Sequence, residues 1–175
     1  MHYGVYRTTA LLLGLSLSPG AWAVEGFGIE LGQGLDTDMG RLSARWALIQ
    51  DREFRRNWTL GTFWESGIGY WQGNRSGGTK LWEIGLTPVF RLNSRESNFF
   101  WEGGIGVHFL SQSHIDGGRE FGSHFSFAEH LGFGWHLSST SPYEILYRFQ
   151  HLSNANTAMP NDSINFHQVQ FGFNY

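Results

Sequence analysis

His151 and Ser153 stand two residues apart in FQHLSNANTAMPND, the segment of residues 149–162. On a β-strand, side chains at positions i and i+2 project from one face and lie about 6.5–7 Å apart along the backbone. Suitable rotamers can then bring an imidazole nitrogen toward a hydroxyl. A serine beside a histidine is the minimum pair for acyl transfer, with the serine as nucleophile and the histidine as its base. The spacing therefore predicts an esterase site if this segment forms a strand.

A third side chain is needed to hold the second ring nitrogen of His151. Asn165 is the candidate, because counting back by twos from Tyr175 places it on the apolar face of the C-terminal segment. Antiparallel pairing across the connection 154–163 brings position 165 beside residues 151–153. An asparagine can accept the imidazole N–H and fix its tautomer, but it cannot offset the charge of an imidazolium.

Two neighbouring polar residues compete for this third role. Asp162 is the nearest carboxylate and would serve if the connection folds back, although an aspartate in MPNDS is typical of a turn. His167 shares the face of Asn165 and is typical of a polar residue at the membrane interface. His151 and Ser153 also have an interpretation without catalysis, since polar side chains are ordinary in the headgroup zone just above the hydrocarbon.

Apolar and polar residues alternate through the whole chain, which predicts strands. In the C-terminal segment, one face carries only apolar residues, namely Val169, Phe171, Phe173 and Tyr175. Other segments have alternate rows that mix small residues with charges of both signs, which suits the narrow interior of a small barrel. The predicted strands span residues 25–34, 41–49, 57–69, 81–92, 99–110, 124–136, 143–153 and 164–175.

This pattern predicts an all-β fold, an eight-stranded antiparallel transmembrane β-barrel. An even number of strands of about 9–12 residues, joined by alternately shorter and longer connections, is what such a barrel requires. The longer connections, at residues 71–80, 111–123 and 154–163, would lie outside the cell together with residues 35–40. The shorter ones would face the periplasm, at residues 50–56, 93–98 and 137–142.

The first 23 residues have the features of a secretory signal peptide, with Arg7 before an apolar run and AWA at its end. Residues 24–175 are then expected to form the barrel. Without the signal, one of 12 basic residues and none of 15 acidic residues is lost, which leaves 11 against 15 and a net charge of −4. This charge gives no sign of nucleic-acid binding, and the absence of cysteine excludes a disulfide framework. No apolar run approaches the roughly 18 residues of a transmembrane helix.

Charged residues on the predicted interior rows are interpreted as an ion network that fills the barrel: Glu30, Glu65, Glu83, Glu102, Arg45, Arg91 and Arg148. Glu129 breaks the pattern, because it shares a row with the apolar residues Phe127 and Leu131. We expect either a bulge that shifts the register or an outer half of this strand that does not face lipid. Burial beside Arg148 or His130 is therefore predicted for Glu129, without a catalytic role.

The stretch YRFQHLSNANTAMPN, residues 147–161, runs into the C-terminal strand and resembles the lipid A 3-O-deacylases of the bacterial outer membrane. In that family a His-x-Ser-Asn-Ala segment sits on an eight-stranded barrel. The resemblance implies that Ser153 is the nucleophile and that His151 is first the general base and then the general acid. The signal peptide, the strand rhythm and the aromatic C-terminus extend the likeness over the whole chain.

The same resemblance assigns neighbours and partners to this couple. It implies that Asn154 and Asn161 lie near the oxyanion, and it places the family's acidic triad member at Asn165, where this chain departs from the family pattern. It also implies lipid A or lipopolysaccharide as substrate and a location among the lipids of the outer membrane. We expect no cofactor, no metal and no nucleic acid, and the sequence is compatible with a homodimer.

The sequence thus predicts a serine esterase that removes the ester-linked 3-position acyl chain of lipid A in the outer leaflet. The acyl chains would lie along an apolar wall formed by Ile145, Tyr147, Phe149, Val169 and Phe171. The first alternative is a non-catalytic small outer-membrane barrel, either of a structural or adhesion type or an inactivated family member. A soluble ligand-carrying barrel is a more distant alternative, because the rows opposite the apolar ones carry charges.

Overall fold

The computed structural model describes residues 23–75, 77–115 and 118–175. Apart from Ala23, the predicted signal peptide lies outside the described residues. Within these ranges, no helix has the length and apolar character needed to cross a membrane. The strands are β1 (Gly26–Gly34), β2 (Thr37–Arg55), β3 (Trp58–Gly73), β4 (Lys80–Ser94), β5 (Phe99–Leu110), β6 (His114–Ile115), β7 (Arg119–Glu120), β8 (Phe125–His136), β9 (Tyr143–Ser153) and β10 (Ile164–Asn174).

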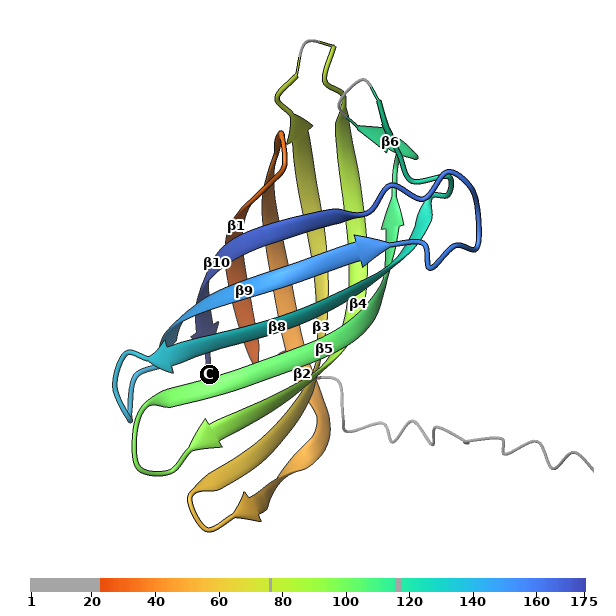
Figure 1. Ribbon diagram of the computed structural model, residues 1–175. Helices are drawn as coiled ribbons and strands as arrows, with labels where there is room; N and C mark the ends of the chain where they lie inside the picture. Colours follow the sequence, from red (N-terminus) through yellow and green to blue (C-terminus); the bar gives the residue numbers. More distant parts are fainter. Residues whose placement is uncertain (1–22, 76, 116–117) are drawn as a thin grey trace, which may run out of the picture.

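Eight of these strands close into an antiparallel barrel with the order β1-β10-β9-β8-β5-β4-β3-β2. The short strands β6 and β7 form a separate hairpin within the connection between β5 and β8, at one end of the barrel (Figure 1). We call this the outer end, because the connections after β3, β5 and β9 gather there. The first described residues and the C-terminus meet at the opposite end, where Tyr175 N donates to Glu25 O at 3.0 Å. The predicted eight-stranded barrel is confirmed.

The β2–β3 hairpin is the main departure from the predicted strand bounds. The predicted turn at 50–56 is wrong, because β2 continues to Arg55 and β3 begins at Trp58. This extension projects below the barrel in Figure 1 and is largely exposed. Its sequence, QDREFR, has no apolar row because the hairpin extends into water, where ladder hydrogen bonds alone can hold two strands together. Register shifts between Ala47 and Arg55 mark the point where the regular barrel ladder ends.

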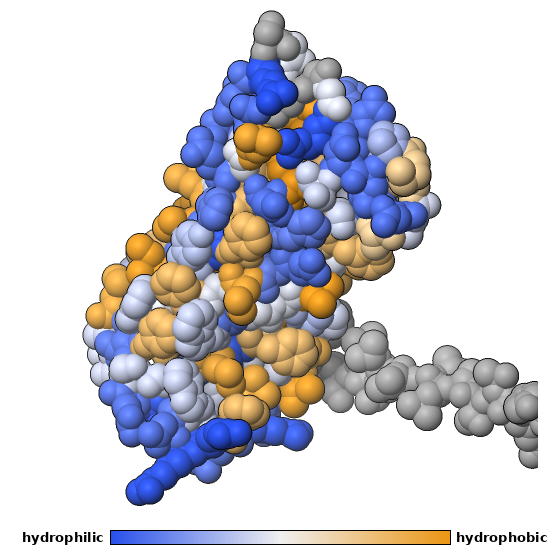
Figure 2. Space-filling view, viewed as in Figure 1, coloured by the Kyte–Doolittle hydropathy of each residue, from blue (hydrophilic) through white to orange (hydrophobic). Residues whose placement is uncertain are grey.

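Apolar side chains cover the outer wall of the barrel. Ile29, Leu131 and Val169 expose 59%, 62% and 51% of their surface there, which would be unfavourable in water. In Figure 2, apolar residues spread over the middle of the visible face and hydrophilic ones gather at its two ends. This is the arrangement of a membrane barrel and excludes a soluble carrier, whose apolar rows would surround its ligand.

An ion network fills the middle of the interior, as predicted. All the predicted members take part, and the described network also includes Arg41 and Glu144. Both additions could have been found from the period of two, because Arg41 shares a row with Arg45 and Glu144 shares one with Arg148. Each glutamate of the network contacts an arginine, which offsets the cost of removing its charge from water.

Arg148 connects three glutamates of this network. Its guanidinium lies 3.2 Å from Glu30, 2.8 Å from Glu65 and 2.6 Å from Glu102. Arg148→Met keeps much of the side-chain volume but removes a partner from three buried acids, and breaking a buried pair costs about 3–5 kcal/mol. We expect the free energy of unfolding, measured by urea unfolding of the refolded barrel in detergent, to fall by this amount. Arg52→Met, at an exposed site on β2, is the control, and equal losses in the two variants would contradict the prediction.

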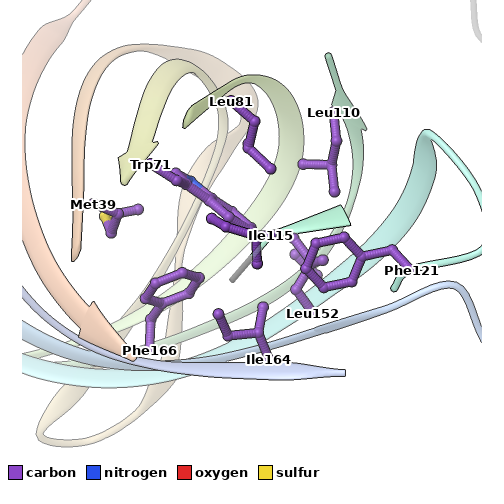
Figure 3. Close-up of a cluster of buried hydrophobic side chains, with 10 residues drawn as sticks. Met39, Trp71, Leu81, Leu110, Ile115, Phe121, Leu152, Ile164 and Phe166 are labelled. Atoms are coloured by element: carbon purple, nitrogen blue, oxygen red, sulfur yellow. The ribbon is translucent and has the colours of Figure 1, made fainter. Parts of the chain in front are cut away.

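An apolar cluster closes the outer end of the barrel interior (Figure 3). Trp71 packs edge-on against Phe166, with 4.7 Å between ring centroids, and against Phe121, with 6.3 Å. Its Nε1 donates to Glu83 at 2.7 Å, which ties the cluster to the ion network. The other members are Met39, Leu81, Leu110, Ile115, Ala128, Leu152 and Ile164. The cluster thus anchors the ends of β9 and β10 from inside.

Candidate active site

The end of β9 and the start of β10 carry the predicted site. Leu152 and Ile164 pair with each other across these strands, and both are buried in the apolar cluster. Because side chains alternate between the two faces of a strand, their neighbours His151, Ser153 and Asn165 project from the outer wall. Packing inside the barrel therefore sets the direction of the polar side chains outside it.

His151 and Asn165 lie directly opposite each other, and the structure brings them into contact. Nδ1 of His151 is 2.6 Å from Oδ1 of Asn165. An amide oxygen only accepts hydrogen bonds, so Nδ1 carries the proton and donates it. Nε2 is then left with the lone pair that a general base needs. This is the orienting geometry expected of Asn165.

Ser153 is the last residue of β9 and stands beyond the final pair between β9 and β10. Its partner on β8 is Phe127, whereas the last β9–β10 pair is Leu152 with Ile164, so the side toward β10 is open. Among the described residues, no hydrogen bond joins the Ser153 hydroxyl to His151. Both residues are half-buried on one face, and catalytic contacts of this kind often tighten only when substrate is bound.

Asn154 and Asn161, the residues predicted near the oxyanion, meet in the connection after β9. The backbone N–H of Asn154 donates to Oδ1 of Asn161 at 3.0 Å, and Nδ2 of Asn161 donates to the exposed Asn156 at 3.0 Å. The Asn154 side chain is fully buried, and its Nδ2 donates to the carbonyls of Phe121 and Ala158 at 2.6 and 2.8 Å. Both amides therefore shape the loop, and their oxyanion role stays a prediction.

The loop that these amides shape turns sharply after Ser153. Ala155 and Asn156 adopt left-handed backbone conformations, with φ of 53° and 61°. For alanine this conformation is strained and persists only when surrounding contacts impose it. The buried Asn154 side chain supplies such contacts, so it holds the backbone directly beside the candidate nucleophile.

Asn154→Ala should loosen this loop without unfolding the barrel. The change removes the donor for two carbonyls, and an unsatisfied buried polar group costs about 1–3 kcal/mol. We expect faster cleavage by limited proteolysis between residues 155 and 163 and an activity about tenfold lower. The control is Ser163→Ala, because the Ser163 side chain is exposed in the same loop. Proteolysis at the parent rate in Asn154→Ala would contradict the anchoring role.

The two residues that competed with Asn165 are engaged elsewhere. The Asp162 carboxylate accepts the backbone N–H of Glu120 at 3.0 Å, and Asp162 N donates to Glu120 O at 2.9 Å. Asp162 therefore fastens the loop to β7. Nδ1 of His167 lies 2.6 Å from the hydroxyl of Tyr147. Neither residue hydrogen-bonds to His151 in the described structure, so Asn165 is the side chain that holds the imidazole.

Glu129 is not where the sequence analysis placed it. The prediction of burial beside Arg148 or His130 is wrong, because Glu129 is exposed on the outer wall. β8 pairs with β5 and β9 without a register shift, so no bulge moves Glu129 out of its row. Its partner on β9 is His151. The β8–β9 pairing, which the strand predictions already contained, was the signal that could have revealed this neighbour.

Comparison with known proteins decides the family. Residues 38–174, which include the whole site, match the family described as lipid A 3-O-deacylase (PagL). The chain belongs to this family. The resemblance first seen in residues 147–161 is thereby confirmed and extends from β2 to β10.

Two curated relatives bear the name lipid A deacylase PagL. The protein of Bordetella bronchiseptica is 30% identical over 154 residues, which are 85% of this chain and 83% of that protein. The protein of Pseudomonas aeruginosa is 28% identical over 162 residues, which are 91% of this chain and 85% of that one. The crystal structure of the outer membrane enzyme PagL matches with a TM-score of 0.75 and 22% identity. The match covers 86% of this chain and 99% of the PagL chain. The structural match shows a shared fold.

Proposed function

We propose that the chain is an outer-membrane serine esterase that hydrolyses the ester-linked 3-position acyl chain of lipid A. The reaction and its substrate are those named in the description of its family. The observation that supports the serine mechanism is the 2.6 Å contact between His151 and Asn165, two residues from Ser153 on the outer wall. Residues 1–23 act as the signal peptide in this proposal, and residues 24–175 form the mature barrel.

Ser153 attacks the ester carbonyl carbon in the first step. Nε2 of His151 takes the hydroxyl proton, while Asn165 keeps the ring oriented through Nδ1. The bond to the 3-oxygen of the sugar then breaks, and His151 returns the proton to this oxygen. The products of this step are the shortened lipid A and an acyl group on Ser153.

Negative charge on the carbonyl oxygen needs donors that are already in place. The backbone N–H of Asn154 directly follows Ser153, and the side chain of Asn161, which accepts a hydrogen bond from it, carries a second N–H donor at Nδ2. Rotation of the Asn161 side chain away from the exposed Asn156 would free both donors at once. We therefore assign the oxyanion to this pair.

Water completes the reaction by attacking the acyl group on Ser153. His151 accepts a proton from the water and gives it to Ser153 as the fatty acid leaves. The serine and the histidine are then ready for another cycle. All residues in these steps come from one chain, so the mechanism does not require a homodimer.

The substrate reaches the site from within the membrane in this proposal. Ser153 and His151 face outward near the outer end of the barrel, at the level expected for lipid A headgroups. Acyl chains can lie along the exposed apolar wall below them, formed by Ile145, Tyr147, Phe149, Val169 and Phe171. The apolar contact holds the lipid in place without enclosing it.

Mass spectrometry of lipid A from cells that express the chain tests this proposal. We expect lipid A to become lighter by the mass of one hydroxy fatty acid minus one water, because hydrolysis adds a water across the ester. The free acid should appear in equal amount. Cells that express Ser153→Ala at the same level provide the control. Intact lipid A in both cultures, with the folded barrel present in the outer membrane, would instead favour the alternative of a non-catalytic barrel.

A further inference from the structure

Glu129 is a carboxylate on a wall that otherwise faces lipid. Its row neighbours Phe127 and Leu131 expose 37% and 62% of their surface, as expected of side chains that contact acyl chains. Ionisable side chains on the lipid face of a barrel destabilise it, so they are rare unless function requires them. We therefore expect a polar or charged side chain on the same wall to interact with the Glu129 carboxylate.

That partner is fixed by strand pairing. Glu129 on β8 is opposite His151 on β9, and His151 is opposite Asn165 on β10. The three residues thus form one row across three strands, with the imidazole in the middle. Side chains at opposite positions have Cβ atoms about 4.5–5.5 Å apart, which is within the reach of a glutamate.

The Glu129 carboxylate and the His151 imidazole border the same groove in the outer wall. Its volume is about 530 Å³, and both Glu129 and His151 line it. Gly103 on β5 belongs to the lining, and its missing side chain leaves room on the outer wall beside Leu131, the row neighbour of Glu129. The rest of the lining is mostly apolar and includes Phe90, Ile105, Leu131 and Phe149. Charges that face such a low-dielectric space interact more strongly than in water.

We propose that Glu129 is a positioning residue that supplies the negative charge which Asn165 lacks. This inference rests on the proposed function, in which His151 becomes an imidazolium each time it takes a proton. Asn165 orients the ring through Nδ1. Glu129, on the opposite side of His151, stabilises the charged ring through space. The two roles that one acidic residue usually combines are divided between β8 and β10.

Other charged or titratable groups around His151 do not supply this charge. His167 on β10 lies one row below and is hydrogen-bonded to Tyr147. The Asp162 carboxylate is turned toward the backbone of Glu120. His130, which also lines the groove, is buried on the interior side of β8 and lies 3.8 Å from Glu102. Glu129 is thus the carboxylate that the described residues place beside the imidazole.

The test compares Glu129→Gln with the parent on lipid A in detergent micelles. We expect kcat to fall about tenfold with little change in KM, because the lost interaction is strongest when the ring is charged. The acidic limb of the pH–rate profile should move to lower pH, since the ring loses a neighbouring negative charge. Glu96→Gln, at an exposed turn near the opposite end of the barrel, is the matched control and should leave both unchanged.

A double-mutant cycle separates this role from a purely structural one. Asn165→Asp places a carboxylate at the hydrogen-bonded side of the ring, so Glu129→Gln should then change kcat less than about threefold. A structural effect of Glu129→Gln would instead be the same in both backgrounds. Equal losses in the two backgrounds, with an unmoved pH profile, would overturn the role of Glu129.

Failure of the proposed function can be distinguished from failure of this inference. A folded parent without deacylase activity would overturn both. In an active parent, an unchanged rate and pH profile for Glu129→Gln would overturn the role of Glu129 alone. Protonation of the His151 ring, followed by NMR in the Ser153→Ala background, provides a readout that needs no turnover. Its midpoint should fall to lower pH when Glu129 is replaced by Gln, and an unmoved midpoint would contradict the inference.

Discussion

Ser153→Ala is expected to lower the rate of lipid A deacylation by about 10³-fold or more while the barrel stays folded. The hydroxyl is the proposed nucleophile, so its removal eliminates the acyl-enzyme route. The same hydroxyl makes no hydrogen bond in the described structure and stands at the end of β9, so the barrel does not depend on it. The measurement is the release of fatty acid from purified lipid A, with heat-dependent mobility in gel electrophoresis as the check of folding.

His151→Ala should lose nearly as much activity, because the serine then has no base. Residues that act as a unit have strongly non-additive effects, so the double variant should be within about twofold of the slower single variant. Ser163→Ala, a serine in the neighbouring loop, serves as the control and should retain the parent rate. Substantial deacylation by Ser153→Ala would contradict the assignment of the nucleophile.

The barrel could be predicted from the sequence because lipid constrains the outer face of each membrane strand and the narrow interior constrains the other face. An apolar outer row and a polar inner row must alternate in every strand, and the bounds of β5 and β9 followed directly from this pattern. The extension of β2 could not be predicted, because residues beyond the hydrocarbon need no apolar row. Local composition in QDREFR then suggests a turn, whereas the hydrogen-bond ladder with β3 continues.

The site could be predicted in part for a similar reason. His151 and Ser153 are neighbours along one strand, and Asn165 is opposite them across a single hairpin, so their proximity follows from local sequence. Glu129 joins the site through β8, which pairs with β9 across the short connection 137–142 and places Glu129 opposite His151. The sequence showed that Glu129 is an acidic residue in an otherwise apolar outer row. Because it was explained by a bulge or by burial, its position beside His151 was not predicted.

Asn165 offers the second large effect, because this chain carries an amide where the family pattern has an acid. Asn165→Ala removes the 2.6 Å hydrogen bond that orients His151. A hydrogen bond to a charged partner is worth about 1.5–3 kcal/mol, which corresponds to a loss of about 10- to 100-fold in kcat. Asn165→Asp keeps the shape of the side chain and adds a charge that stabilises the imidazolium, so we expect kcat to rise.

The size of this rise depends on two opposing terms. A low-dielectric surrounding strengthens the attraction between the carboxylate and the charged ring, but removing the carboxylate from water costs free energy. Asn165 is exposed near the outer end of the barrel, where the cost is moderate, so we expect a gain of up to about tenfold. The variants are compared as purified, folded proteins on lipid A in detergent. If Asn165→Ala deacylates as fast as the parent, Asn165 does not orient His151, and Asp162 becomes the next residue to replace.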